Sequence, residues 1–345
     1  MMVALAIASY SINVVYMEFT RTELQIATDL ATRAACRSLV DTQSKPEAYR
    51  SAQRLAQANP VAGQVLTIAY EDLAFSVATR SLEGEAYRYT SGSNPNSVNF
   101  RSAFFERSEQ SVPMLFPTLG VPITFRPIKE ASATQAELDI AIVLDCSSSM
   151  LASMTEKSAP EGLLELPLLT PVPLGARWRL AKAGIGEMLD EFSDSPQTEL
   201  VSITAFNTAV LFNLGLSDFY LPIREFMTFQ EFAYLGGMSD LAGGMNRGLD
   251  HHADELRARP WASRVLLLIS DGNGNLGSNP LSVAQNAAAS NVMLYTISVS
   301  DEANQAALAK LAAIGRGKHF HVESAAEFRA IAKSITRRLP ILITK

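Results

Sequence analysis

A run of apolar residues that ends in an aspartate and three serines constrains this chain more than any other stretch. The sequence DIAIVLDCSSSM runs from Asp139 to Met150 and is almost entirely apolar up to Asp145. A continuous run of Ile, Val and Leu is typical of a strand that is buried on both faces. A ligand site at the end of the strand would explain why the run stops on a charge and a group of hydroxyls.

From Leu138 onward, apolar strands alternate with helical stretches. Strands are expected at 139–145, 200–206, 265–270, 292–299 and 318–322, with a hairpin strand near 209–214. Helices are expected near 177–192, 241–258, 280–289, 303–314 and 324–338. This order predicts an α/β fold with a doubly wound, mostly parallel six-stranded sheet.

Two carboxylates are expected to meet at one edge of this sheet. Asp145 ends the first strand, and Asp271 follows the apolar run RVLLLIS, which we place beside that strand. Ligands bind beyond the carboxyl ends of parallel strands, where the strand order reverses. The D-x-S-x-S spacing lets Asp145, Ser147 and Ser149 converge there, and Ser239 adds a hydroxyl from the segment GGMSDLAGGM.

These side chains predict a metal site with the ligands Asp145, Ser147, Ser149, Ser239 and Asp271. A set of oxygen ligands favours Mg²⁺ or Mn²⁺ over zinc. Because hydroxyls are neutral ligands, such an ion would readily take a carboxylate of another molecule as its last ligand. The alternatives are a structural turn capped by a serine, and a domain with the same fold that binds no metal.

Composition and motifs argue against several other functions. The net charge of −6 does not favour a nucleic-acid partner, which would want a basic face. No G-x-S-x-G surrounds the serines, and no histidine is placed as an obvious base, so we expect neither an enzyme nor a small-molecule substrate. A metal-assisted hydrolase that holds the ion with Asp145 and Asp271 is the alternative, and its one candidate base is Asp240.

The four histidines are expected to lie outside any site. His251 and His252 are in a polar helical stretch and are predicted to be solvated. His319 and His321 have strand spacing, share a face, and are predicted to be edge or surface residues. Two such residues do not make a zinc site, which needs at least three protein ligands.

The N-terminal part of the chain has a different character. Residues 1–17, MMVALAIASYSINVVYM, carry no charge and as a helix would extend about 26 Å, against about 30 Å for a bilayer core. We interpret them as most of a transmembrane helix that begins upstream of this sequence. The alternative is a buried core helix.

Two further segments lead to the α/β domain. Residues 18–60 are expected to form a helical stalk, with a stripe of small residues along a helix that continues to about Val40 and a second helix over 46–58. Residues 61–130 contain the short runs QVLTIAY, FSVATRSL, EAYRYT and PITFRPI, which predict a small β-rich module. Residues 129–137 are interpreted as a linker.

The runs DIAIVLDCSSSM and LLLISDG resemble the von Willebrand factor type A domain, over roughly residues 138–338. This resemblance implies a metal-ion-dependent adhesion site, in which a D-x-S-x-S motif, a later threonine and a later aspartate hold the ion. The residues that match the motif are Asp145, Ser147, Ser149 and Asp271. Ser239 stands where the family usually has threonine, and because serine lacks a stiff χ1, Asp240 is an alternative ligand.

The apolar span and the following RTELQIATDLATRAA resemble the TadE/TadG-like proteins of bacterial tight-adherence (Flp) pilus systems, over about residues 1–40. The combination implies a single-pass protein of the bacterial cell membrane that acts in pilus assembly or surface attachment. Its C-terminal domain would lie outside the cytoplasm and recognise an acidic group on a protein partner. Basic residues after the span, such as Arg21 and Arg33, favour the opposite orientation, in which the domain would be a cytoplasmic adaptor for an ATPase.

Overall fold

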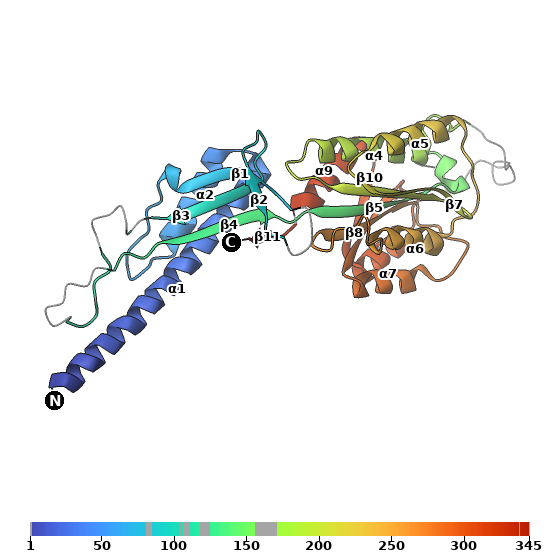
Figure 1. Cartoon of the computed structure of the whole chain (residues 1–345). Helices are drawn as coiled ribbons and strands as arrows, with labels where there is room; N and C mark the ends of the chain where they lie inside the picture. Colours follow the sequence, from blue (N-terminus) through green and yellow to red (C-terminus); the bar gives the residue numbers. More distant parts are fainter. Residues whose placement is uncertain are drawn as a thin grey trace. The chain divides into compact units, whose positions relative to one another are not determined.

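The computed structural model describes residues 2–80, 85–103, 105, 111–117, 125–155, 171–337 and 339–344 (Figure 1). The chain divides into two compact units. The first consists of Met1–Ala136 together with Pro340–Lys345, and the second of Glu137–Leu339. The second unit is therefore an insertion between two segments of the first.

The first unit is an antiparallel sheet packed against helices. Its strands are β1 (Leu73–Thr79), β2 (Arg88–Thr90), β3 (Ser97–Ser102), β4 (Lys129–Gln135) and β11 (Ile341–Ile343). Their order in the sheet is β11-β4-β3-β1-β2. The helices are α1 (Met2–Thr42), α2 (Lys45–Ala58) and the short 3-10 turn η1 (Tyr70–Asp72). This unit confirms the predicted β-rich module that follows a long N-terminal helix.

Small residues let the helices of this unit pack closely. Ala31 and Ala35 of α1 are buried, as are Ala48 and Ala52 of α2. They share one core with the sheet residue Phe100. The predicted stripe of alanines on α1 therefore faces both the second helix and the sheet.

The first turns of α1 carry large apolar side chains that the unit does not bury. Val3, Leu5 and Ile7 are 74%, 68% and 62% exposed. Asn13, a polar residue in this stretch, donates from Nδ2 to the carbonyl of Phe116 and accepts at Oδ1 from its amide, both at 3.0 Å. By length and composition alone, α1 is long and apolar enough to cross a membrane.

The second unit contains the predicted six-stranded sheet. Its strands are β5 (Leu138–Asp145), β6 (Leu200–Phe206), β7 (Val210–Ser217), β8 (Ser263–Ser270), β9 (Val292–Val299) and β10 (Arg316–Val322). Their order is β10-β9-β8-β5-β6-β7. All neighbours are parallel except β6 and β7, which form the predicted hairpin. The mostly parallel α/β fold is therefore confirmed.

Helices cover both faces of this sheet. The helices of the unit are α4 (Arg177–Ser193), α5 (Leu221–Phe232), α6 (Leu241–His252), α7 (Pro280–Ala289), α8 (Gln305–Ile314) and α9 (Ala325–Arg337). Ile140 and Ile142 of β5 belong to the core shared with α4, α5 and α9, whereas Ala141 and Val143 belong to the core shared with α6, α7 and α8. The alternation along β5 thus explains why every residue of this strand is buried.

The strand order reverses at β5. This strand pairs with β6 on one side and with β8 on the other. The crevice beyond its carboxyl end is the place where open parallel sheets bind ligands. Asp145 is the last residue of β5, so the fold positions its carboxylate at this point.

Three expectations for the secondary structure are wrong. Residues 129–137 are not a linker, because Lys129–Gln135 form β4, which pairs with β3 and β11. Strand β4 is rich in Ala, Ser and Thr and is buried from Ala131 onward, so its small side chains gave a weak apolar signal. The run 64–70 forms no strand beyond an isolated bridge at Gln64. The helix expected over 241–258 ends at His252.

Candidate metal centre

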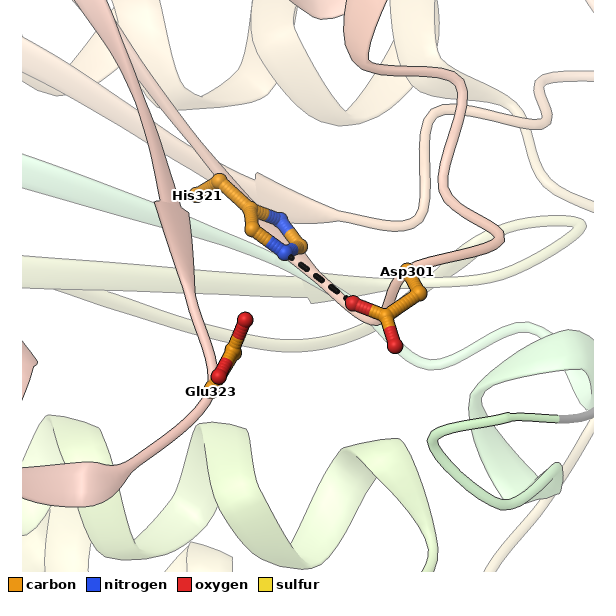
Figure 2. A group of neighbouring side chains, drawn as sticks. All are labelled: Asp301, His321 and Glu323. Atoms are coloured by element: carbon orange, nitrogen blue, oxygen red, sulfur yellow. Dashed lines mark ion pairs between the residues drawn. The ribbon is translucent and has the colours of Figure 1, made fainter.

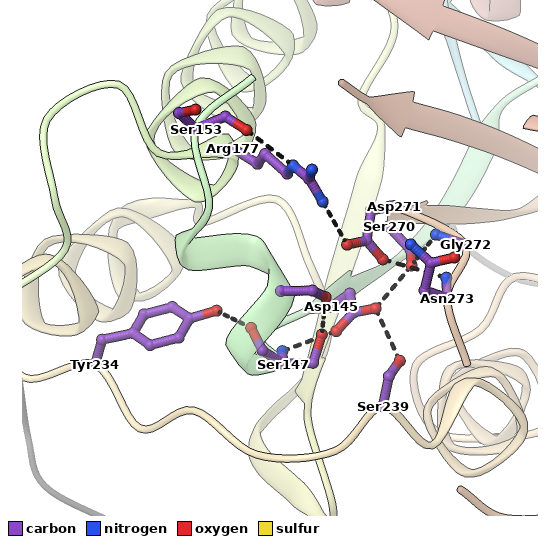
Figure 3. Close-up of polar contacts among 11 residues, drawn as sticks. Asp145, Ser147, Ser153, Arg177, Tyr234, Ser239, Ser270, Asp271, Gly272 and Asn273 are labelled. Carbon is purple, nitrogen blue, oxygen red and sulfur yellow. Dashed lines mark hydrogen bonds and ion pairs between the residues drawn. The ribbon is translucent and has the colours of Figure 1, made fainter. Parts of the chain in front are cut away.

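Asp145 connects three separate segments through its carboxylate (Figure 3). Its Oδ1 accepts a hydrogen bond from the backbone amide of Ser147 at 2.8 Å. Its Oδ2 accepts from the hydroxyl of Ser239 at 2.9 Å and from that of Ser270 at 2.7 Å. Asp145 and Ser239 are 94 residues apart in the chain, yet the fold brings them into direct contact.

The two serines of the D-x-S-x-S motif point to the same place. The hydroxyl oxygens of Ser147 and Ser149 lie 3.0 Å apart. After Asp145 the chain turns into the short 3-10 helix η2 (Ser148–Leu151), and the hydroxyl of Tyr234 donates to the carbonyl of Ser147 at 3.1 Å. Ser147 is buried and Ser149 is partly exposed, so solvent reaches the hydroxyl pair from the side of Ser149.

The loop that carries Ser239 is held against η2 by the middle serine of the cluster. The amide of Ser148 donates to the carbonyl of Gly237 at 2.9 Å, and the amide of Gly237 donates to the hydroxyl of Ser148 at 3.0 Å. A Cβ atom on Gly236 would lie 2.6 Å from the Ser148 hydroxyl, and one on Gly237 would lie 2.7 Å from the hydroxyl of Thr208. The two glycines are therefore needed for the close approach that delivers Ser239.

Asp271 lies directly after β8 and is fully buried, but its main partner is a cation of the chain itself. Arg177, the first residue of α4, donates from Nη1 to Asp271 Oδ2 at 2.8 Å, and both side chains are fully buried (Figure 3). Asp271 Oδ1 accepts from the amide of Asn273 at 3.2 Å. Arg177 also donates from Nε to the carbonyl of Ser153, which fixes the guanidinium between two segments.

The sequence reasoning did not find Arg177. A single arginine at the start of a helix, in GARWRLAK, carries no signal that it is buried. It also did not find Ser270, whose hydroxyl bonds Asp145, or Asn275, whose side chain accepts from the amide of Ser239 at 2.8 Å. The apolar run that ends in SDG could have drawn attention to Ser270, because it lies next to a predicted ligand.

Asp240, the alternative ligand, has a structural role in this fold. It is the N-cap of α6, and its Oδ1 accepts from the amide of Gly243 at 2.9 Å. Such a cap satisfies one of the free amides at the start of a helix. The other five predicted ligands, by contrast, are carried by the ends of β5 and β8 and by the loop before α6.

Burial gives this cluster an unbalanced charge. Burial, and then the negative charge of Asp271, raise the pKa of the Asp145 carboxyl from 3.8 to about 6. The cluster contains two buried carboxylates and one guanidinium, which pairs with Asp271, and its other oxygen-bearing side chains are neutral hydroxyls. A small divalent cation with oxygen ligands would balance the second carboxylate, so the residues present fit a Mg²⁺-like ion.

Comparison with protein families matches the von Willebrand factor type A domain over residues 139–336. The chain belongs to the von Willebrand factor type A domain family. No curated protein sequence matches the chain.

Several solved structures have a similar fold. BatB from Bacteroides thetaiotaomicron is 18% identical, with 59% of this chain and 98% of that chain covered and a TM-score of 0.43. Proximal thread matrix protein 1 from the mussel byssus, with a zinc-occupied MIDAS motif, is 17% identical, with 61% and 48% covered and a TM-score of 0.42. Manganese-loaded TRAP from Plasmodium vivax is 14% identical, with 62% and 78% covered and a TM-score of 0.42.

The prediction for two histidines of the von Willebrand A domain is wrong. His251 and His252 are buried and not solvated, because the face of α6 that carries them packs on the sheet. His252 Nε2 lies 3.0 Å from the carbonyl of Val265, and burial lowers the pKa of His252 to about 4. His319 and His321 lie on β10, an edge strand, as predicted.

Proposed function

We propose that this chain is a membrane-anchored binding protein whose von Willebrand A domain recognises an acidic group on a protein partner through a divalent cation. The observation that carries the proposal is the contact between Asp145 and Ser239, next to the paired hydroxyls of Ser147 and Ser149. Four oxygen-bearing side chains from two distant segments meet where the strand order reverses. A set of oxygen ligands at this edge of the sheet supports a site for a divalent cation.

In this proposal Asp145, Ser147, Ser149 and Ser239 hold the ion, and the buried Arg177 fixes the carboxylate of Asp271 beside it. A bound Mg²⁺ or Mn²⁺ supplies an electron-poor centre that accepts a carboxylate of the partner as a ligand. The hydroxyls leave the negative charge of the site low, which favours the approach of a second acid. The partial exposure of Ser149 supplies the direction of approach.

Binding is favoured over hydrolysis because the candidate general bases are engaged elsewhere. Asp240, the one acid considered for that role, caps α6. Each histidine also has another partner: His251 contacts Thr204, His252 contacts Val265, and His319 and His321 contact hydroxyls of β9. A hydrolase would need a base within hydrogen-bond reach of a water or substrate at the crevice.

The anchor in this proposal is the N-terminal part of α1. Its exposed apolar side chains would face lipid, and the hydrogen bonds of Asn13 to Phe116 satisfy a polar group near the membrane boundary. The resemblance of residues 1–40 to TadE/TadG-like proteins supports a role in pilus assembly or surface attachment, with the von Willebrand A domain outside the cytoplasm. Protease accessibility in whole cells compared with spheroplasts tests the orientation, and protection of the domain in both would contradict it.

Metal binding is tested with the full chain in detergent micelles, by thermal unfolding with and without Mg²⁺. Mg²⁺ should raise Tm, because a ligand that binds only the folded state stabilises it, and Asp145→Asn should abolish this rise. Asp240→Asn is the matched control, because asparagine also caps helices well. A rise that persists in Asp145→Asn, or that is lost in Asp240→Asn, would contradict the assigned ligands.

A further inference from the structure

A second cluster of metal-ligand side chains lies at the carboxyl edge of the same sheet, on its outermost parallel pair. Asp301 follows β9, and His321 and Glu323 lie at the end of β10 (Figure 2). One ligand atom from each of these three residues lies within 4.8 Å of the other two. His321 Nε2 is 3.5 Å from Asp301 Oδ1.

The imidazole of His321 is oriented from behind by a buried residue. In the register of the two strands His321 is paired with Ser298, and its Nδ1 lies 2.8 Å from the Ser298 hydroxyl, which is fully buried. When Nδ1 carries the hydrogen and donates to this hydroxyl, the lone pair of Nε2 is directed to the two carboxylates. A hydrogen bond from the second ring nitrogen is the usual support of a histidine that binds a metal.

The charges of the cluster also point to a cation. Within the described part of the chain, neither Asp301 nor Glu323 forms an ion pair with a lysine or arginine, and Asp301 pairs only with the imidazole. Two neighbouring carboxylates repel each other unless a positive charge lies between them. A cation held by His321 would supply that charge at the one place that both acids face.

We propose that Asp301, His321 and Glu323 form a second metal site, which takes Zn²⁺ in preference to Mg²⁺. One imidazole nitrogen and two carboxylate oxygens suit zinc, which is bound at about 2.0–2.2 Å and often by three protein ligands and a water. Two ligands of a tetrahedral ion at about 2.1 Å are about 3.4 Å apart, so the three side chains, whose ligand atoms lie within 4.8 Å of one another, must rotate inward to bind it. Mg²⁺ takes oxygen ligands and does not favour imidazole.

This site does not depend on the proposed function of the Asp145 centre. Its ligands come from β9 and β10, whereas the Asp145 centre is built on β5, β8 and the loop before α6. The two sites also differ in ligand chemistry, since only the second contains nitrogen. A protein with both would carry a zinc site and, at Asp145, a site for Mg²⁺ or Mn²⁺ (the hard-ion site) along one edge of the sheet.

The test is isothermal titration of the full chain in detergent with Zn²⁺, in excess Mg²⁺ so that the hard-ion site is filled. The wild type should bind one equivalent, and His321→Ala and Glu323→Gln should each weaken binding at least tenfold. Ser298→Ala, which removes the support of the imidazole, should weaken binding about 10- to 100-fold. The control is His319→Ala, which removes the other histidine of the strand. His319 is not one of the three proposed ligands and contacts the Ser298 hydroxyl only at 3.4 Å, so its loss should change the affinity less than threefold.

Three results would overturn the proposal. They are no zinc binding by the wild type, equal binding by the wild type and His321→Ala, and an equal loss in His319→Ala and His321→Ala. Unfolding curves in EDTA show that each variant is folded before it is titrated. Zinc that remains in His321→Ala but is lost in Asp145→Asn would assign the ion to the first centre instead.

Discussion

The two acidic clusters at the carboxyl edge of the sheet in the second unit differ in how their negative charge is balanced. Asp145 and Asp271 are fully buried, and Arg177 is buried with them as an internal counter-charge. Asp301 is largely exposed, and its one ion-pair partner in the described residues is an imidazole. Burial makes the first cluster rigid and dependent on every partner, whereas water screens the second and lets its residues change at little cost.

The largest effect is expected from Arg177→Met. Removal of one partner of a buried ion pair leaves an uncompensated charge on Asp271, which should lower the free energy of unfolding by about 3–5 kcal/mol in EDTA. Mg²⁺ should recover part of this loss, because the ion brings positive charge to the same carboxylates. Urea denaturation with and without Mg²⁺ measures both effects.

Arg179→Met is the matched control for this experiment. Arg179 lies on the same helix and pairs with Glu231, but both side chains are partly exposed. Arg179 also donates to the carbonyls of Val172 and Pro173, so its loss should cost about 1–2 kcal/mol, less than that of Arg177, and should not respond to Mg²⁺. Equal losses in the two variants would show that burial does not distinguish the two arginine pairs.

The second effect concerns a buried carboxylate that lacks an ion-pair partner among the described residues. Burial raises the pKa of Glu199 from 4.5 to about 8, although the Ser195 hydroxyl donates to it at 2.7 Å. Between these pH values the folded chain holds a proton that the unfolded chain releases. The free energy of unfolding should therefore fall as the pH rises from about 5 to 8, by up to about 1.4 kcal/mol per unit.

Glu199→Gln should flatten this slope, because glutamine does not ionise. Urea denaturation of the wild type and the variant at several pH values measures the difference, which isolates Glu199 from Asp145, whose pKa is also raised. Parallel slopes would mean that Glu199 is ionised in the folded chain. In that case a buried carboxylate of this chain would stay ionised without an arginine partner, and the pairing of Asp271 with Arg177 would not explain the difference between the two acids.

A smaller effect is expected at Ser239. Ser239→Ala removes the hydroxyl that contacts Asp145, and we expect a loss of Mg²⁺ affinity of about tenfold, or about 1.4 kcal/mol. Ser239→Thr keeps the hydroxyl with a stiffer χ1 and should stay within about threefold of the wild type. If Ser239→Ala and the wild type bind Mg²⁺ with equal affinity in a calorimetric titration, Ser239 is not a ligand.

The smallest effect is expected from Asp301→Asn. Because Asp301 is exposed, its replacement should change the free energy of unfolding by less than about 0.5 kcal/mol in EDTA. With Zn²⁺ present, the wild type should gain stability that the variant lacks. A large decrease in the free energy of unfolding of Asp301→Asn in EDTA would show that the exposed cluster contributes to stability as the buried one does.

The parts of the fold that sequence reasoning predicted are those with strong apolar periodicity. Strand β5 is buried on both faces, and its residues from Ile140 to Leu144 are apolar without interruption, between the buried Asp139 and Asp145. Strand β4 was missed because it is built from small and polar residues that fit beside α1. Helix α5 was also missed, since four of its twelve residues are buried and its apolar stripe is mixed with exposed phenylalanines.

The candidate site was partly predictable for a related reason. Asp145 and Asp271 each end an apolar run, and the rule that ligands bind at the carboxyl ends of parallel strands brings such residues together. Arg177 follows no such rule, because its burial depends on the tertiary position of α4. The charge balance of the site therefore could not be read from the motif.

Strand β11 determines the order in which the two units can be completed during synthesis. Ile341 pairs with Gln135, and because synthesis runs from the N-terminus to the C-terminus, this outer strand of the first sheet emerges from the ribosome after the whole of the second unit. Until then the edge of β4 is unpaired, and an open strand edge can recruit strands of other chains. The unit that emerges first is therefore completed last, and the edge of β4 stays open to other strands until β11 has emerged.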